Sequence, residues 1–167
     1  MRKNKVILGI LVLLAIGVTA CGSTESPVET TSTPDVGSYL ASYLNHLNQW
    51  STGFNDVQSV NRQLAEGTAT LADDDLKVQL SNALTDLEES SRAMATLSPP
   101  IPGLGYFQTR ATELDAQTRT FTTMYVQSLT GDDEAQEAAK AALDSAVAIY
   151  TEIVTEFNKL TDLILQQ

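Results

Sequence analysis

The residue of this 167-residue chain to which a chemical role is most readily assigned is its single cysteine, Cys21. With no second thiol, the chain cannot form an internal disulfide, so Cys21 is free to accept a modification. It follows a basic segment, residues 1–5 (MRKNK), and an uncharged run rich in Leu, Ile and Val from Val6 to Ala20. This layout is typical of a secretory signal. We therefore expect residues 1–20 to direct export and Cys21 to lie at the processing site.

The four residues that end the apolar run, Val18-Thr19-Ala20-Cys21, resemble the lipobox of bacterial lipoproteins. The resemblance covers residues 1–21. It implies that the Cys21 thiol accepts a diacylglyceryl group, that cleavage precedes Cys21, and that the new amino terminus can carry a further acyl chain such as palmitate. It also implies attachment to the cell membrane or outer membrane on the extracytoplasmic side, with Gly22 leaving the outer membrane open. The alternative is ordinary cleavage after Ala20, which leaves a free thiol.

Charge restricts the partners of the processed chain. Removing Arg2, Lys3 and Lys5 with the signal leaves 7 basic residues against 21 acidic ones, a formal net charge of −14. Such a surface repels nucleic acid and anionic lipid headgroups. We expect no nucleic acid partner and attachment to the membrane through the lipid on Cys21. Solubility, cations and basic peptides remain as explanations of the acidic surface.

Composition divides the processed chain into a tether and a folded part. Residues 21–35 are rich in Ser, Thr and Pro and have almost no large apolar side chains, which predicts a flexible tether. Residues 36–167 instead show apolar residues at helical spacing, interrupted at Gly67, at Pro99-Pro100 and at Gly131. This pattern predicts an all-α, antiparallel up-down-up-down four-helix bundle, with helices at about 36–66, 73–98, 102–130 and 132–166.

Each predicted helix carries one apolar stripe that we expect to face the core. Asn61 is a polar residue on the stripe of the first helix. The expected core positions are Leu40, Tyr43, Leu47, Trp50, Phe54, Val57 and Leu64, then Leu76, Leu80, Leu84, Leu87, Met94 and Leu97, then Leu104, Phe107, Leu114, Phe121, Tyr125 and Leu129, and finally Leu143, Ile149, Ile153, Phe157, Leu160 and Ile164.

The chain lacks the residue combinations of common bundle cofactors. Di-iron sites need Glu-x-x-His pairs, but the only histidine, His46, follows Tyr43 at that spacing. One cysteine cannot supply a C-x-x-C-H haem site or a Cys/His zinc site. No G-x-S-x-G or S-x-x-K motif is present. We expect no catalytic, cofactor or metal residues and no enzymatic activity; haem held by His46 and a methionine remains an alternative.

Two acidic clusters invite a metal interpretation. Asp73–Asp75 and Asp132–Glu134 lie at predicted helix starts, where carboxylates are stabilised by free amide hydrogens and by the helix dipole. They lack the spacing of a D-x-D-x-D-G calcium loop. We therefore expect capping rather than metal binding.

Two further features predict surface recognition. Tyr39 and Tyr106 lie near helix ends and are the aromatic residues we expect to be exposed, as a shallow recognition patch. The segment Ser98–Gly105 is rigid and apolar, which suits either a stiff connector or a docking surface.

These patterns together favour a non-enzymatic envelope lipoprotein, held at the membrane by Cys21, whose bundle binds or spaces an unidentified protein partner. The alternative is a four-helix sensor-like domain that holds a small ligand or cofactor.

Overall fold

The computed structural model describes residues 35–165, and the expected signal and most of the expected tether, residues 1–34, lie outside this part. The described residues form four α-helices: α1 (Val36–Ala65), α2 (Asp74–Thr96), α3 (Gly105–Ser128) and α4 (Asp133–Leu165). A short 3₁₀ helix, η2 (Pro102–Leu104), leads into α3.

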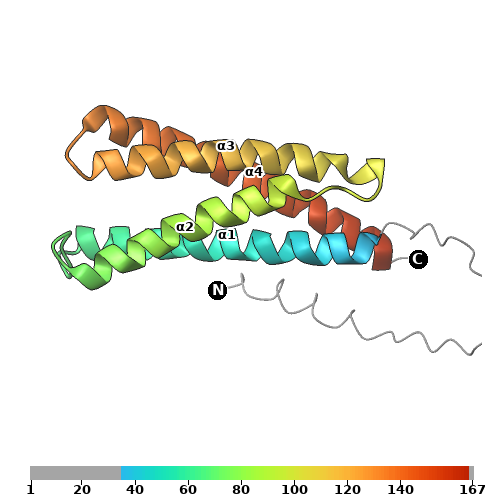
Figure 1. Ribbon diagram of the computed structural model, residues 1–167, viewed down its shortest axis with the longest axis horizontal. Coiled ribbons are helices and arrows are strands. Elements are labelled where there is room, and N and C mark those ends of the chain that lie inside the picture. Colours follow the sequence, from blue (N-terminus) through green and yellow to red (C-terminus); the bar gives the residue numbers. More distant parts are fainter. Residues whose placement is uncertain (1–34, 166–167) are drawn as a thin grey trace, which may run out of the picture. The chain divides into compact units, whose positions relative to one another are not determined.

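The helices pack in chain order and alternate in direction. The backbone of α1 approaches α2, α2 approaches α3, and α3 approaches α4. One end holds the start of α1, the connection between α2 and α3, and the last turn of α4; we call it the terminal end (Figure 1). The other end holds residues 66–73 and 129–132; we call it the loop end. The prediction of an all-α antiparallel four-helix bundle is confirmed.

The helix ends follow from their local residues. Gly67 and Gly131 have φ values of 66° and 88°, which side chains with a Cβ rarely adopt, and they follow α1 and α3. The carboxylate of Asp132 accepts the amide hydrogen of Ala135 at 3.0 Å, so it caps α4 as expected. Asp35 caps α1 in the same way, with a 3.1 Å bond from the Ser38 amide, and the hydrogen bonds from Ser38 lower the pKa of Asp35. We had expected Asp35 to belong to the tether; it is the N-cap of the bundle.

The connection between α2 and α3 begins earlier than its prolines alone predict. Helix α2 ends at Thr96, and Leu97 has an extended backbone with ψ of 122°. Residues before proline are driven out of the helical region, which carries the extended chain to Pro99. Pro102 then occupies the first position of η2, where its missing amide hydrogen is not needed.

The core contains most of the expected stripes, but α4 differs from the prediction. Its first half is buried through small residues spaced four, three and four apart, namely Ala135, Ala139, Ala142 and Ala146. Leu143 and Ile149 are only partly buried. Alanine side chains allow the backbones of α3 and α4 to approach closely, so the contact face of α4 is set by its small residues there. Farther along, Ile153 and Phe157 are buried as expected.

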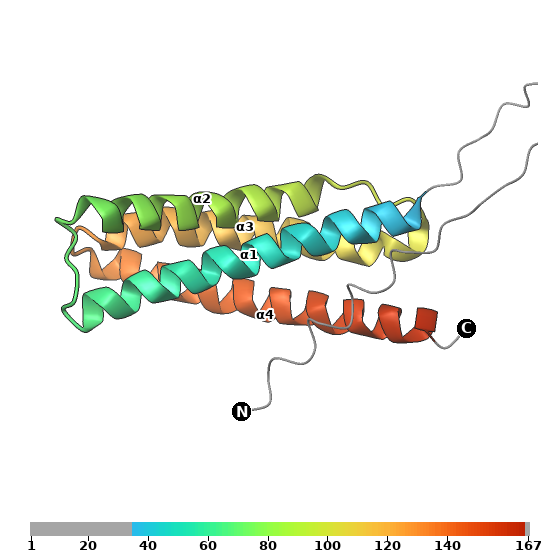
Figure 2. The ribbon, with the colours of Figure 1, turned by 90° about the horizontal axis from the view of Figure 1, so that it is seen from below.

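Aromatic side chains fill the wider space between α1 and α4. No Cα atom of α1 lies within 8 Å of one in α4, and Figure 2 shows α1 running obliquely across the bundle. The Trp50 ring stacks on Tyr150 of α4 at 4.9 Å between centroids and on Phe54 at 5.7 Å. Large rings therefore bridge the separation that smaller apolar residues would leave empty.

Three hydrogen bonds join α1 to α3 through the core. The Tyr43 hydroxyl donates to the Phe107 carbonyl at 3.0 Å. The Trp50 indole donates to the Thr118 hydroxyl at 3.0 Å. A third bond, from the Tyr125 hydroxyl to the Asn61 side-chain oxygen, measures 2.5 Å and explains the polar residue on the α1 stripe. Because buried polar groups are costly without partners, these bonds fix the register between the two helices.

Stability should fall at alkaline pH. Burial raises the pKa of Tyr39, Tyr43 and Tyr125 above the ordinary value of about 10. The folded state therefore keeps protons that the unfolded chain loses, so stability is complete below about pH 10 and declines above it. We expect a loss of about 1.4 kcal/mol per pH unit for each tyrosine that stays protonated when folded. Urea unfolding across this range measures the slope.

The matched variant is Tyr125→Phe, which removes one of the three hydroxyls. Above about pH 10, the free energy of unfolding of this variant should fall less steeply with pH than that of the parent chain. The difference in slope should be about 1.4 kcal/mol per pH unit, which is the contribution of one proton. An identical alkaline slope in both proteins would show that Tyr125 ionises equally in the folded and unfolded states.

Candidate functional site

The expected lipidation residue, Cys21, lies outside the described residues, so the structure bears only on the other predicted surface features. The prediction for Tyr39 is wrong. Only 6% of Tyr39 is exposed, and its hydroxyl is buried with no hydrogen-bond partner among the described residues. Its ring lies 6.0 Å from that of Tyr43, because the apolar stripe of α1 extends to the first turn and includes position 39.

Tyr106 is exposed as expected, at 41%. The guanidinium of Arg110 lies 5.8 Å from its ring centroid, a cation–π arrangement. Arg110 also pairs with Glu113 at 2.5 Å and with Glu152 of α4, and its hydrogen bond with Glu113 raises its pKa. Tyr106 and Tyr39 do not form a joint surface patch, because one ring is outside and the other is in the core.

The segment Ser98–Gly105 is anchored at one point and exposed at another. Leu104 is buried, with 4% exposed, whereas Ile101 is 42% exposed. Leu163, near the end of α4, is 62% exposed. The terminal end thus presents isolated apolar side chains.

His46 does not meet a methionine. It exchanges a 3.0 Å hydrogen bond with Gln49 on its own helix and lines a polar surface groove of about 480 Å³ between α1 and α2, opposite Asp86 and Glu89. Met94 is fully buried in the core, Met124 packs against the core from α3, and neither lines the groove at His46. The structure therefore does not bring together the pair proposed for haem.

The two acidic clusters both lie at the loop end. Asp73 is the N-cap residue of α2, but its carboxylate accepts the Thr70 amide hydrogen at 2.7 Å instead of capping the helix. Asp74 pairs with Lys77 at 2.8 Å. The expected capping role is therefore met by Asp132 and not by Asp73, because the preceding turn draws the Asp73 carboxylate away from the helix.

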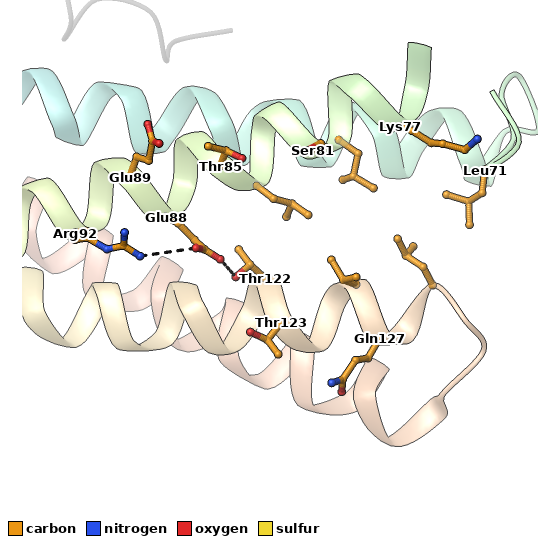
Figure 3. A pocket seen from close by; sticks show the side chains of 14 residues that line it. Leu71, Lys77, Ser81, Thr85, Glu88, Glu89, Arg92, Thr122, Thr123 and Gln127 are labelled. Atoms are coloured by element: carbon orange, nitrogen blue, oxygen red, sulfur yellow. Dashed lines mark hydrogen bonds and ion pairs between the residues drawn. The ribbon is translucent and has the colours of Figure 1, made fainter. Parts of the chain in front are cut away.

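A groove of about 830 Å³ lies between α2 and α3, and we call it the α2–α3 groove. Figure 3 shows the two helices diverging toward the loop end, where Leu71 lies. Leu71 precedes α2, and Leu129 follows α3, so the loops supply the last apolar contacts of the groove. Its apolar lining residues are Leu71, Leu80, Leu84, Val126 and Leu129.

Two of these apolar side chains are exposed to an unusual degree. Val126 is 52% exposed and Leu71 is 39% exposed. Leu80 and Leu84 lie deeper, at 6% and 9%. The α2–α3 groove therefore has an apolar floor that belongs to the core and an apolar edge that meets solvent.

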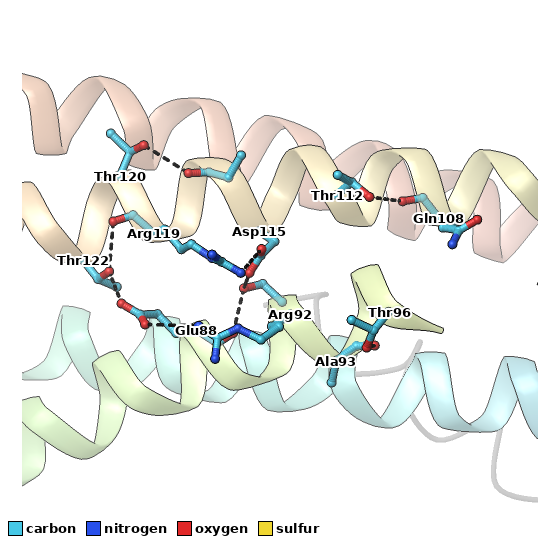
Figure 4. Close-up of polar contacts among 12 residues, drawn as sticks. Glu88, Arg92, Ala93, Thr96, Gln108, Thr112, Asp115, Arg119, Thr120 and Thr122 are labelled. Atoms are coloured by element: carbon cyan, nitrogen blue, oxygen red, sulfur yellow. Dashed lines mark hydrogen bonds and ion pairs between the residues drawn. The ribbon is translucent and has the colours of Figure 1, made fainter. Parts of the chain in front are cut away.

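Polar contacts close the α2–α3 interface on the side nearer the terminal end (Figure 4). Glu88 accepts a hydrogen bond from the Thr122 hydroxyl and lies 4.0 Å from the guanidinium of Arg92. Next along the interface, Ser91 donates to Asp115 at 3.1 Å. The Thr122–Glu88 and Ser91–Asp115 bonds hold the two helices together there. Glu88, Arg92 and Thr122 also line the groove, which therefore extends along α2 as far as Arg92.

The expected absence of catalytic and cofactor residues is not decided by this geometry. Within residues 35–165, no three His, Cys, Asp or Glu side chains gather as they would around a metal ion. None of the described helices has both the length and the apolar character needed to cross a membrane.

The chain matches no protein-family model, no curated protein and no solved structure.

Sequence reasoning did not single out the α2–α3 groove. Its exposed members, Leu71 and Val126, are apolar residues outside the expected stripes, and that is the signal that could have drawn attention to them. The groove itself depends on how far two helices diverge, which a single-helix pattern does not report.

Proposed function

We propose that this chain is a bacterial envelope lipoprotein, attached to the membrane through Cys21 on the extracytoplasmic side, whose helical bundle is a non-enzymatic binding module. The observation that carries the binding function is the α2–α3 groove, with Leu71 and Val126 exposed along its edge. Apolar side chains gathered in a concave surface are typical of sites that receive another molecule.

The placement of the groove suits a protein held at one end. Residue 35 begins the described chain at the terminal end, so a tether from Cys21 joins the bundle there. The α2–α3 groove opens toward the opposite, loop end (Figure 3). An anchored bundle would thus present the groove away from its attachment, where a partner can reach it.

The bundle centre favours this proposal over a ligand held inside the core. Trp50, Tyr43, Leu87 and Leu114 are among the largest fully buried side chains, each with at most 2% of its surface exposed, so the protein's own side chains fill the centre of the described bundle. Binding at the surface requires no displacement of these residues.

Replacing the anchor residue tests the proposed attachment. In bacteria grown with labelled palmitate, the parent chain should incorporate label and partition into detergent, because two acyl chains give stable membrane anchoring. Cys21→Ser should reduce the label to background and leave an uncleaved precursor, since the hydroxyl does not replace the thiol as acceptor.

The matched control is Ser23→Ala, which changes a nearby residue of the same segment and should keep full labelling. Label on the Cys21→Ser chain, or cleavage of the parent chain without any label, would contradict the anchor.

A further inference from the structure

The two ends of the bundle differ in charge. At the loop end, residues 66–75 and 132–134 contribute seven carboxylates, and the adjoining helix turns carry two basic residues, Arg62 and Lys77, a formal charge of −5. At the terminal end, the connection between α2 and α3 lies within residues 93–109, a run without a charged side chain. The bundle therefore has one strongly acidic end and one end whose connecting segment is uncharged.

The charged side chains that adjoin this connection are few. Lys159 of α4 pairs with Glu156 at 2.5 Å, which leaves no net charge. Asp35 caps the start of α1, and Asp162 is exposed in the last turn of α4. Together these four residues have a formal charge of −2, so the terminal end is less repelled by an anionic surface than the loop end is.

Three large apolar side chains project from the terminal end. Ile101 of the connection is 42% exposed, Tyr106 in the first turn of α3 is 41% exposed, and Leu163 in the last turn of α4 is 62% exposed. The ion pair between Arg110 of α3 and Glu152 of α4 fixes the start of the one helix beside the last turns of the other (Figure 1). The three side chains therefore lie on adjoining elements at one end of the bundle.

The backbone of the connection holds Ile101 in position. Pro99, Pro100 and Pro102 restrict the chain on both sides of it. The Leu104 amide donates a hydrogen bond to the Ile101 carbonyl at 3.1 Å, and the Leu104 side chain is buried in the core. Ile101 therefore loses little conformational freedom when it makes a contact.

The form of this surface favours a lipid bilayer over a folded partner. A stable protein–protein interface needs closely packed, complementary surfaces, whereas separate apolar side chains can each enter the fluid headgroup region of a bilayer. Tyrosine is enriched at the boundary between hydrocarbon and water, which suits the exposed ring of Tyr106.

The place where the chain enters the bundle brings a bilayer to this end. Asp35 lies at the terminal end and is 14 residues beyond Cys21, a distance of at most about 45–50 Å for extended chain. A lipid on Cys21 therefore keeps Ile101, Tyr106 and Leu163 at a high effective concentration near the membrane. Under that condition a contact made by three side chains is sufficient, although it would be weak without the tether.

We propose that the terminal end of the bundle contacts the lipid surface that holds Cys21, with Ile101, Tyr106 and Leu163 in the headgroup region and the loop end directed away from it. The inference rests on the proposed anchor, and it adds a second membrane contact and an orientation. In this orientation the α2–α3 groove opens away from the membrane.

The test uses the chain isolated from bacterial membranes and reconstituted into phosphatidylcholine vesicles, with brominated phosphatidylcholine as the quencher of tryptophan fluorescence. Ile101→Trp reports on the terminal end. Val78→Trp is the matched control, because Val78 is 60% exposed on α2 near the loop end. Trp50 is 2% exposed, and the parent chain supplies its background. Quenching of Ile101→Trp should exceed that of Val78→Trp at least threefold; equal quenching at the two positions, or none at Ile101→Trp, would overturn the inference.

A second set of variants tests the apolar contact itself. With Leu163→Trp as the reporter, adding Ile101→Asp should reduce the quenching by at least half, whereas adding Val78→Asp should leave it unchanged. Both aspartates replace exposed side chains, so circular dichroism should show unaltered helical content. Since each adds one negative charge, an equal reduction by both would assign the effect to charge alone and contradict contact through Ile101.

Flotation of the vesicles separates this inference from the proposed anchor. A chain that floats with the vesicles but shows no quenching at Ile101→Trp retains the anchor and overturns the contact. A chain that carries no lipid and does not float contradicts the anchor, and the inference fails with it.

Discussion

Replacing Trp50 with alanine is expected to lower the free energy of unfolding by about 4 kcal/mol. The side chain is 2% exposed, stacks on Tyr150 and Phe54, and donates a hydrogen bond to Thr118. Its removal leaves a cavity where α1 and α4 are too far apart for their backbones to close it. Urea unfolding followed by circular dichroism measures the loss.

Two companion variants locate the effect. Trp50→Phe keeps part of the ring contact and should cost less than Trp50→Ala. Tyr106→Ala removes an aromatic ring that is 41% exposed and should cost less than about 1 kcal/mol. Equal losses for Trp50→Ala and Tyr106→Ala would mean that the aromatic bridge between α1 and α4 does not support the fold.

Introducing a side chain at Gly53 is expected to have the second large effect. A Cβ atom there would lie 3.0 Å from the carbonyl oxygen of Ala83 and 3.2 Å from the backbone nitrogen of Leu87. These are backbone atoms of α2, so α1 and α2 would have to separate. We expect Gly53→Leu to lower the free energy of unfolding by about 3 kcal/mol, measured by urea or thermal unfolding.

Gly103 provides the matched control. No neighbouring atom lies within 4 Å of a Cβ built at this position, and its φ is not positive. Gly103→Ala should leave stability unchanged or slightly raised, because it restricts the unfolded chain. A Gly53→Leu protein as stable as Gly103→Ala would contradict the close approach of α1 and α2.

The helical architecture was predictable because its signals are local. Gly67 and Gly131, which take positive φ values, and the pair Pro99-Pro100 interrupt the apolar periodicity at positions close to the observed helix ends. Each of these residues restricts the backbone irrespective of what packs against it. The four helices and their antiparallel order follow from such interruptions and from the short connections.

Features that join distant helices were not predictable in the same way. The hydrogen bond between Tyr125 and Asn61 depends on the register of α3 against α1. The alanine stripe of α4 is buried because α3 lies close to it, although alanine gives little signal in an apolar pattern. Tyr39 was expected to be exposed, but it is buried beside Tyr43 as a member of the core cluster that all four helices form.

The α2–α3 groove is also a feature that joins separate helices, so it could not be predicted from the pattern of one helix. Each stripe residue of the α2–α3 groove, such as Leu84, was expected to be buried, and the acidic clusters were expected to cap helices. The combination of these stripe residues with exposed Leu71 and Val126 into one groove arises because α2 and α3 diverge toward the loop end (Figure 3). Single-helix patterns carry no information on that divergence.

The most direct test of the central proposal is the mass of the amino-terminal peptide of the chain isolated from bacterial membranes. We expect the peptide to begin at Cys21 and to carry a diacylglyceryl group on the thiol, with or without a further acyl chain on the amine. A peptide that begins at Cys21 with an unmodified thiol, or one that retains residues 1–20, would contradict a lipid-anchored binding module.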